Sequence, residues 1–503
     1  MLIALLLLSI FLLLALLMYL GKLPALIALP LLALGVVLVG GVKWQDVVGI
    51  VFSDGSFRLA PAIAAVLMGA VLAQLVDRTG IARVLVTRAA ELGGDRPLAL
   101  ALLLTGVVAL LFTTLGGLGA VIMVATIIFP ILLSIGLPPL VVGVLFLLGM
   151  SLGGIFNLTN WQVYITILGL DTRIILSFAA PLAAILGAAT LTYALVNVGR
   201  GWRWWLAAPF SIVLTSGLVL IIWLIISGLR SAVAPVSNLA SQPVLVFALL
   251  LFLGLLTLVL VGMAFVRAWQ ARGLPGEVDQ ARLPWIALLT PVVPLVPVLI
   301  FSIRNYFVPE AQRFEFPIIT ALLLGIVYGL LTTWRHGGGS LQTLTRSVID
   351  GIAAVAPALA LLVGIGMVLN AMAGPPGAQS WKVTTQIRPL LLAAVPRQPL
   401  LYVLVFGALA PLALYRGPLN LYGMGAGLVA AMYAANALPP AAIMAAFFSV
   451  GLLQGVSDPT NTHNVWVANN LGIDVQRILQ VSLPYVWVGA WLGLMVATVL
   501  FLR

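Results

Sequence analysis

The hydrophobic pattern is a succession of long apolar runs separated by short polar loops. Runs of about eighteen apolar residues recur from end to end, and each is long enough to cross a hydrocarbon core of about 30 Å. The first run, residues 2–20, lacks a basic region before it and a small-residue cleavage site after it, so we expect a retained first span. No long polar stretch is present that could form a sizeable soluble domain. The pattern predicts an all-α polytopic membrane protein.

Two stretches have a mixed pattern instead. Residues 78–96 and 378–397 intersperse arginines with aliphatic side chains, which is typical of helices that lie in the plane of the membrane interface. The longest polar linker, residues 267–283, divides the chain near its middle.

Composition supports this class and narrows the partners. Of 503 residues 63% are hydrophobic and 7% charged, whereas soluble domains carry about 25% charged residues. The net charge of +11 comes from Lys and Arg in short loops, where they set orientation and meet anionic lipid. We therefore expect the lipid bilayer and a small anionic solute as partners, and no nucleic acid.

Enzyme and cofactor signatures are missing. The chain has no cysteine and two histidines, which excludes disulfides and argues against a transition-metal site. It contains no zinc-protease helix, no Walker A loop and no nucleophile elbow. We expect neither an enzyme nor a bound cofactor.

An internal duplication organises the sequence. Residues 106–160 align without gaps with 407–461 and share 15 identities in 55 positions, many of them Gly, Pro and Asn. With a slightly different shift, Asp54-Gly55 pairs with Asp350-Gly351. The number of crossings between equivalent segments is odd whether residues 97–135 form a re-entrant hairpin or two spans. The repeats are therefore predicted to have inverted topology, as in alternating-access transporters.

The expected organisation follows from this duplication. We expect a first repeat over residues 1–203, connecting helices and the linker over 204–283, and a second repeat over 284–503. Each repeat is expected to contain an interface helix, a hairpin and a broken helix. The hairpins are residues 97–135 and 399–437, and the broken helices are residues 139–170 and 440–473.

Both repeats interrupt an apolar helix at the same place. In hydrocarbon each unsatisfied backbone group costs several kcal/mol, so a break is tolerated only where it lines a cavity or is buried in protein. Half-helix N-termini attract anions, while unwound carbonyls and Asn or Thr oxygens hold cations. A proline kink packed by polar residues is the alternative. The polar residues are Asn157, Thr159 and Asn160 in the first break, and Asp458, Thr460, Asn461, His463 and Asn464 in the second.

The hairpin tips and the ionisable residues complete the candidate site. The first tip contains Thr113, Thr114, Gly116 and Gly117, and the second contains Arg416, Gly417 and Asn420. Either tip could instead be an ordinary turn outside the membrane. Ionisable residues inside apolar segments cost at least ~2.5–3.5 kcal/mol and are functional by default. Asp458, His463 and Arg416 are the clearest of these, although His463 could equally be a packing residue.

These features resemble the ion transporter superfamily of secondary carriers. The run Asn461-Thr462-His463-Asn464-Val465-Trp466-Val467, followed by Asn470-Leu471-Gly472-Ile473, is most similar to the gluconate–proton symporters. The hairpin tips lack the Ser-Asn-Thr signature of the sodium-coupled dicarboxylate carriers. The resemblance implies an elevator-type carrier of small carboxylates such as gluconate, citrate or a dicarboxylate, working as a homodimer in the plasma (inner) membrane.

Roles for the candidate residues follow. We expect Arg416 and the half-helix termini to attract the carboxylate. The remaining substrate contacts are expected from Thr113, Thr114, Gly116, Gly117, Asn157, Thr159, Asn160, Gly417, Asn420, Thr460 and Asn461. Asp458, His463 and Asn464 are expected to carry the coupling ion, H⁺ or Na⁺. A sodium ion would lie near Asn157, Asn160, Asp458 and Asn461. A channel, an intramembrane enzyme using Asp458 and His463, and a cation–proton antiporter of the same superfamily remain the alternatives, and the antiporter is the nearest.

Overall fold

The computed structural model describes residues 2–19, 22–199, 202–215, 283–334, 341–378 and 381–502, and these ranges contain helices and no strand. Among them, seven helices are long and apolar enough to cross a membrane, or eight if one bent pair counts as a single span. The chain is thus an all-α polytopic membrane protein, as its hydrophobic pattern predicts. Residues 216–282, which include nearly all of the expected 267–283 linker, lie outside the described residues.

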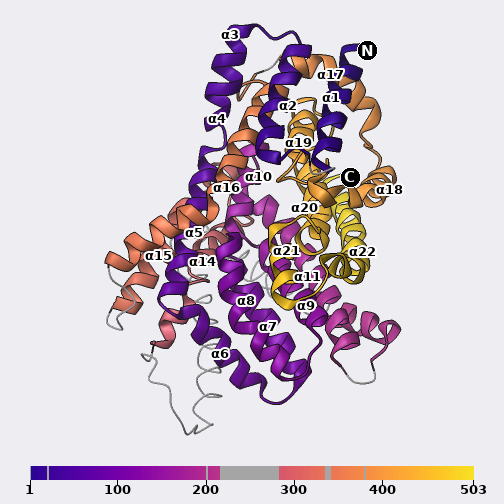
Figure 1. Ribbon diagram of the computed structural model, residues 1–503. Helices are drawn as coiled ribbons and strands as arrows, with labels where there is room; N and C mark the ends of the chain where they lie inside the picture. Colours follow the sequence, from indigo (N-terminus) through magenta and orange to yellow (C-terminus); the bar gives the residue numbers. More distant parts are fainter. Residues whose placement is uncertain are drawn as a thin grey trace.

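The first half of the chain forms a long crossing helix, a hairpin and a bent helix (Figure 1). Its helices are α1 (Leu2–Tyr19), α2 (Ala25–Val39), α3 (Trp44–Asp46), the π-helix η1 (Val47–Asp54), α4 (Gly55–Phe57), α5 (Ala60–Arg78), α6 (Ile81–Gly93), α7 (Pro97–Phe112), α8 (Gly117–Ser134), α9 (Pro139–Ile155), α10 (Leu158–Leu168) and α11 (Thr172–Asn197). The helix α6 occupies the stretch expected at the interface.

The second half repeats this order of elements. Its helices are the 3₁₀ turn η2 (Trp285–Leu289), α14 (Leu295–Arg304), the 3₁₀ turn η3 (Glu310–Gln312), α15 (Ile318–Thr333), α16 (Leu341–Ala373), α17 (Lys382–Ala394), α18 (Pro399–Leu409), the 3₁₀ turn η5 (Ala410–Arg416), α19 (Gly425–Ala434), α20 (Pro440–Ser457), α21 (Thr462–Leu471) and α22 (Val475–Phe501). Here α17 occupies the second stretch expected at the interface.

The apolar runs of the sequence form helices of very different lengths. The run at 59–77 belongs to a helical unit of 35 residues from Trp44 to Arg78, because the π-helix η1 continues into α4 and α5. In contrast, the run at 284–303 yields only the ten-residue α14 after a 3₁₀ turn. Pro291, Pro294 and Pro297 lie in that run, and proline removes a helical N–H donor. In this run three closely spaced prolines accompany the short helix, whereas the long helices α11, α16 and α22 each contain a single interior proline.

The long crossing helices pack antiparallel at two glycines. A Cβ on Gly55 would lie 2.9 Å from the Met367 Cα, and a Cβ on Gly351 would lie 3.1 Å from the backbone of Ala70 and Val71. Both glycines therefore allow backbone-to-backbone contact between the α4–α5 unit and α16, which cross diagonally in Figure 1.

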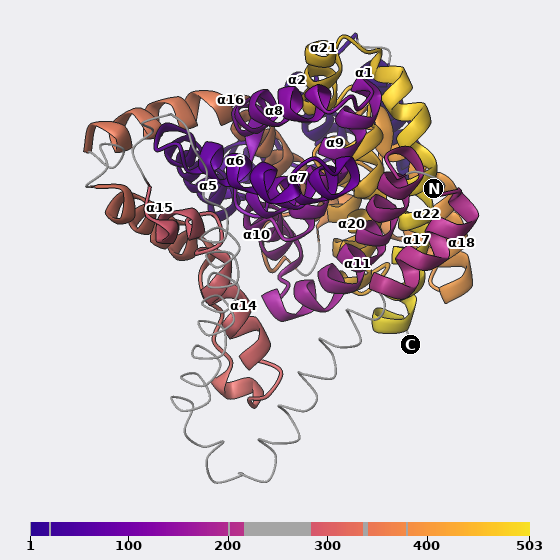
Figure 2. The same cartoon turned by 90° about the horizontal axis from the view of Figure 1, so that it is seen from below.

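The helices α9, α10 and α20 lie together in the middle of the molecule, with α21 at its edge and α15 at one side (Figure 2). Each second half-helix packs on the first half-helix of the other pair. Tyr164 of α10 stacks on Phe448 of α20, with 5.1 Å between the ring centroids. Val467 of α21 packs against α9, where a Cβ on Gly143 would lie 3.3 Å from the Val467 Cγ1. This reciprocal packing brings the two breaks into one region.

Candidate functional site

The first break is held by one amide side chain. Asn157 lies between α9 and α10, which are bent by 48°, and its Oδ1 accepts hydrogen bonds from the Thr159 N–H at 3.0 Å and from the Thr159 hydroxyl. Its Nδ2 donates to Phe112 O at 2.8 Å and to Leu115 O at 2.9 Å, both in the first hairpin tip. Asn157 therefore caps α10 and also ties it to the hairpin.

The second break is held by a carboxylate in the equivalent place. Asp458 follows α20, and its Oδ1 accepts hydrogen bonds from the Thr460 N–H at 2.9 Å and from the Thr460 hydroxyl at 2.8 Å. The same oxygen accepts the backbone N–H of Tyr415, in the second hairpin tip, at 3.0 Å. Both breaks thus use the same local turn and are tied to the hairpin of their own repeat.

The second break leaves two buried oxygens without a partner. Asp458 is 1% exposed and Asn464 is fully buried, yet Asp458 Oδ2 and Asn464 Oδ1 accept no hydrogen bond from any described residue. They belong to one small cluster, because Asn464 Nδ2 donates to Asp458 O at 2.9 Å. Neither ion pair found in the described ranges includes Asp458. A buried carboxylate without a counter-charge is costly, so the arrangement suits a proton or a small cation.

The first hairpin tip uses its threonines for structure. The hydroxyl of Thr113 donates to Leu110 O at 2.6 Å, and the hydroxyl of Thr114 donates to Pro291 O at 2.8 Å. Gly116 caps α8, and a Cβ there would meet no atom within 4 Å. Gly117 follows with φ +83°, a conformation that favours glycine. Of the four predicted residues, the two glycines face open space or adopt a special backbone, and the two hydroxyls are occupied.

The second hairpin tip has an unusual backbone. Tyr415 and Arg416 are consecutive non-glycine residues in the left-handed region, with φ of 56° and 55°. A Cβ on Gly417 would lie 2.2 Å from Leu412 O, so only glycine fits. Asn420 is buried, and its Oδ1 accepts the Tyr422 N–H at 2.9 Å. Left-handed non-glycine residues cluster at functional sites, where the surrounding structure holds them in place.

Arg416 of this tip and His463 of α21 are close enough to interact electrostatically. Arg416 forms no ion pair in the described part of the chain, and its positive charge acts electrostatically on His463 of α21. The His463 N–H donates to Asn461 Oδ1 at 3.2 Å, and Asn461 Nδ2 donates to Gln454 O at 3.2 Å. Asn461 therefore caps α21, and Arg416 is a half-buried cation that lacks a carboxylate.

A tyrosine that the sequence did not single out joins the two halves. The Tyr422 hydroxyl, from the second hairpin, donates to Asn160 Oδ1 at 2.6 Å, and Asn160 Nδ2 donates to Gly154 O at 3.1 Å. The helices α9 and α20 also approach closely, since a Cβ on Gly455 would lie 3.2 Å from Ser151 Oγ. In the repeat alignment Tyr422 matches Val121, so this hydroxyl is present in one repeat only. The presence of a tyrosine in one repeat and a valine in the other is the feature of the sequence that could have identified Tyr422.

No group of three or more His, Asp or Glu side chains in the described ranges could hold a metal ion. The Asp458 carboxylate could instead bind a proton. The neutral oxygens around it are of the kind that coordinate a monovalent cation. Comparison with known proteins adds no further assignment, because no family model and no curated protein matches the chain.

Proposed function

We propose that the chain is a secondary active transporter of a small organic anion, coupled to H⁺ or Na⁺ and working by alternating access. The observation that carries the proposal is the free Oδ2 of Asp458, buried at a helix break that has a matching break in the other half. A buried ionisable group inside a spanning segment marks an ion pathway by default.

Contacts between the halves support inverted repeats. Gly55 and Gly351 are equivalent in the duplication, and so are the segments that they touch. Gly55 packs against Gly366 and Met367, and Gly351 packs against Ala70 and Val71, which are the equivalents of Gly366 and Met367 in the first half. The contact is therefore reciprocal, as a two-fold axis requires. We expect that axis to lie in the membrane plane.

Arg416 supports an anionic substrate. It is a cation near the second break that has no carboxylate partner in the described part of the chain, and a substrate carboxylate would provide one. Neutral oxygens and N–H groups of Asn157, Thr159, Thr460 and Asn461 would supply the remaining contacts.

The resemblance to the ion transporter superfamily completes the proposal. The hairpins and interrupted helices would move as a transport domain against a dimeric scaffold in the plasma (inner) membrane, and the solute would cross without chemical conversion. The competing function is a cation–proton antiporter, which Asp458 alone could support.

Reconstituted vesicles provide the test. We expect saturable uptake of gluconate, citrate or succinate that is driven by an inward proton or sodium gradient. Asp458→Asn should leave substrate binding measurable and remove the dependence of uptake on the gradient, because asparagine keeps the turn but cannot exchange a proton. Asp95→Asn, at an exposed position, is the matched control. Gradient-driven cation flux in the absence of any organic anion would favour the antiporter over the anion carrier. Wild-type coupling in Asp458→Asn would contradict the role of Asp458 in ion coupling.

A further inference from the structure

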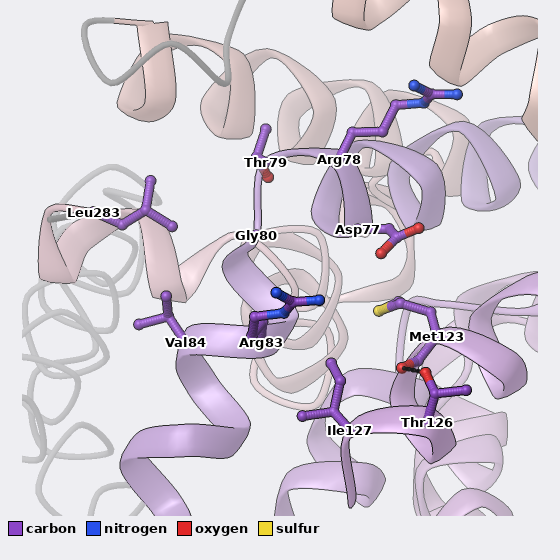
Figure 3. Close-up of a pocket in the computed structure, with 10 residues that line it drawn as sticks. All are labelled: Asp77, Arg78, Thr79, Gly80, Arg83, Val84, Met123, Thr126, Ile127 and Leu283. Atoms are coloured by element: carbon purple, nitrogen blue, oxygen red, sulfur yellow. Dashed lines mark hydrogen bonds between the residues drawn. The ribbon is translucent and has the colours of Figure 1, made fainter. Parts of the chain in front are cut away.

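A cavity of about 580 Å³ lies away from the helix breaks, where α5 ends, α6 begins and α8 passes (Figure 3). Its volume falls within the about 300–1,000 Å³ typical of small-ligand sites. The cavity lies where the membrane-span candidate Trp44–Arg78 ends in the charged residues Asp77 and Arg78. Because charged residues favour the membrane interface, we place the cavity at the level of the lipid head groups.

Two opposite charges point into this cavity without pairing. Figure 3 shows the Asp77 carboxylate and the Arg83 guanidinium in the space between α5, α6 and α8, whereas Arg78 extends away from them. Arg78 is engaged by Asp350 of α16. The described residues form no ion pair between Asp77 and Arg83. The cavity is thus lined by a carboxylate and a guanidinium that interact electrostatically but do not form an ion pair.

The rest of the lining is mixed, with Thr79, Gly80 and Thr126 beside several apolar side chains. Val84 of α6 and Met123 and Ile127 of α8 line the cavity beside the charged pair. A ligand that fits must therefore combine a negative group, a positive group and an apolar part.

We propose that this cavity binds the head group of an aminophospholipid of the phosphatidylethanolamine type. Its phosphate would lie on Arg83, its ammonium on Asp77, and the start of its acyl chains along Met123 and Ile127. Basic pockets between membrane helices are known to hold lipid head groups.

The lining discriminates between lipid classes. A primary ammonium has three N–H donors for the Asp77 carboxylate, whereas a choline head group has none. Quaternary ammonium groups are favoured by aromatic cages, and none of the residues found to line the cavity is aromatic. An anionic head group such as phosphatidylglycerol would leave Asp77 without a partner and would face its charge.

The test uses the purified full-length protein, stripped of lipid in detergent. Phosphatidylethanolamine, phosphatidylcholine and phosphatidylglycerol are added separately, and bound lipid is counted by native mass spectrometry alongside the thermal unfolding midpoint. We expect phosphatidylethanolamine to bind about tenfold more tightly than the other two lipids. Equal binding of the three lipids, or no binding, would overturn the proposal. This test uses the wild-type protein and does not depend on any variant.

Variants assign the two charges. Arg83→Ala should lower phosphatidylethanolamine binding about tenfold, and Arg83→Lys should restore much of it. Asp77→Asn should make phosphatidylethanolamine and phosphatidylglycerol bind equally, because the ammonium loses its partner and the repulsion disappears. Arg96→Ala removes an exposed arginine that does not line the cavity and serves as the control. An unchanged lipid preference in both Arg83→Ala and Asp77→Asn would place the lipid elsewhere.

Discussion

The breaks at Asn157 and Asp458 share one turn and differ in one functional group. Each Oδ1 accepts the N–H and the hydroxyl of the threonine two residues on. The Asn157 amide also donates to two carbonyls of its hairpin tip, while the Asp458 carboxylate has nothing to donate. The second tip presents the Tyr415 N–H instead, and one carboxylate oxygen stays free. Replacing the amide of Asn157 by the carboxylate of Asp458 thus leaves one buried oxygen without a hydrogen-bond donor.

The largest effect is expected from moving the charge to the wrong break. Asn157→Asp would place a carboxylate against Phe112 O and Leu115 O and remove both donors. Such a buried, unpaired charge costs about 3–5 kcal/mol, so the unfolding midpoint in detergent should fall steeply. Asn469→Asp, at an exposed position of α21, should have little effect. A variant as stable as wild type would show that the two breaks tolerate charge equally.

The next largest effect concerns the cation that only the second repeat carries. Arg416→Ala should weaken substrate binding by well over tenfold, as expected for loss of a desolvated charge pair at about 2–5 kcal/mol. Isothermal titration with the transported carboxylate measures this. Arg388→Ala removes an exposed arginine of α17 as the control. Unchanged affinity in Arg416→Ala would make this cation structural.

A smaller effect is expected at the contact between the two halves. Tyr422→Phe removes the hydroxyl that donates to Asn160 Oδ1 and should cost about 1–2 kcal/mol, because a partly buried acceptor loses its donor. Tyr433→Phe on α19 is the control, since no described hydrogen bond uses its hydroxyl. Equal unfolding midpoints for the two variants would mean that the Tyr422 hydrogen bond contributes nothing.

The sequence predicts much of this comparison, and its failures have physical causes. The Asn, Thr and Asp residues near 157–160 and 458–461 indicate both breaks, since these side chains compete with helical hydrogen bonding. The tie between Asn157 and Phe112 and the bridge from Tyr422 to Asn160 join residues distant in sequence, so no local pattern reports them. The 35-residue unit ending at Arg78 is not evident from hydrophobicity, because a π-helix continues through polar Ser53 and Asp54.

The last comparison concerns the N-terminal caps of α11 and α22, the helices that follow the two interrupted helices. Asp171 and Asp474 are equivalent, and each accepts the N–H of the residue two positions on. Asp171 has a second carboxyl beside it, that of Glu315 in the α14–α15 connection, with Arg173 and Tyr306 also nearby. No such neighbour of Asp474 is found among the described residues. Burial, together with the Asp171 carboxyl, raises the pKa of Glu315 to about 7.

The sign of the resulting pH dependence follows from that shift. Near pH 6 the folded protein holds a proton on Glu315 that the unfolded chain releases, so stability falls as pH rises from about 4.5 to about 7. Because the Glu315 side chain is only partly buried, screening by solvent limits the effect to about 1 kcal/mol. Glu315→Gln should therefore flatten the decline of the unfolding midpoint between pH 5 and pH 8, while Glu310→Gln, exposed in the same connection, should keep the wild-type slope. Equal slopes in all three proteins would show that Glu315 does not hold a proton in the folded protein at pH values where the unfolded chain has released it.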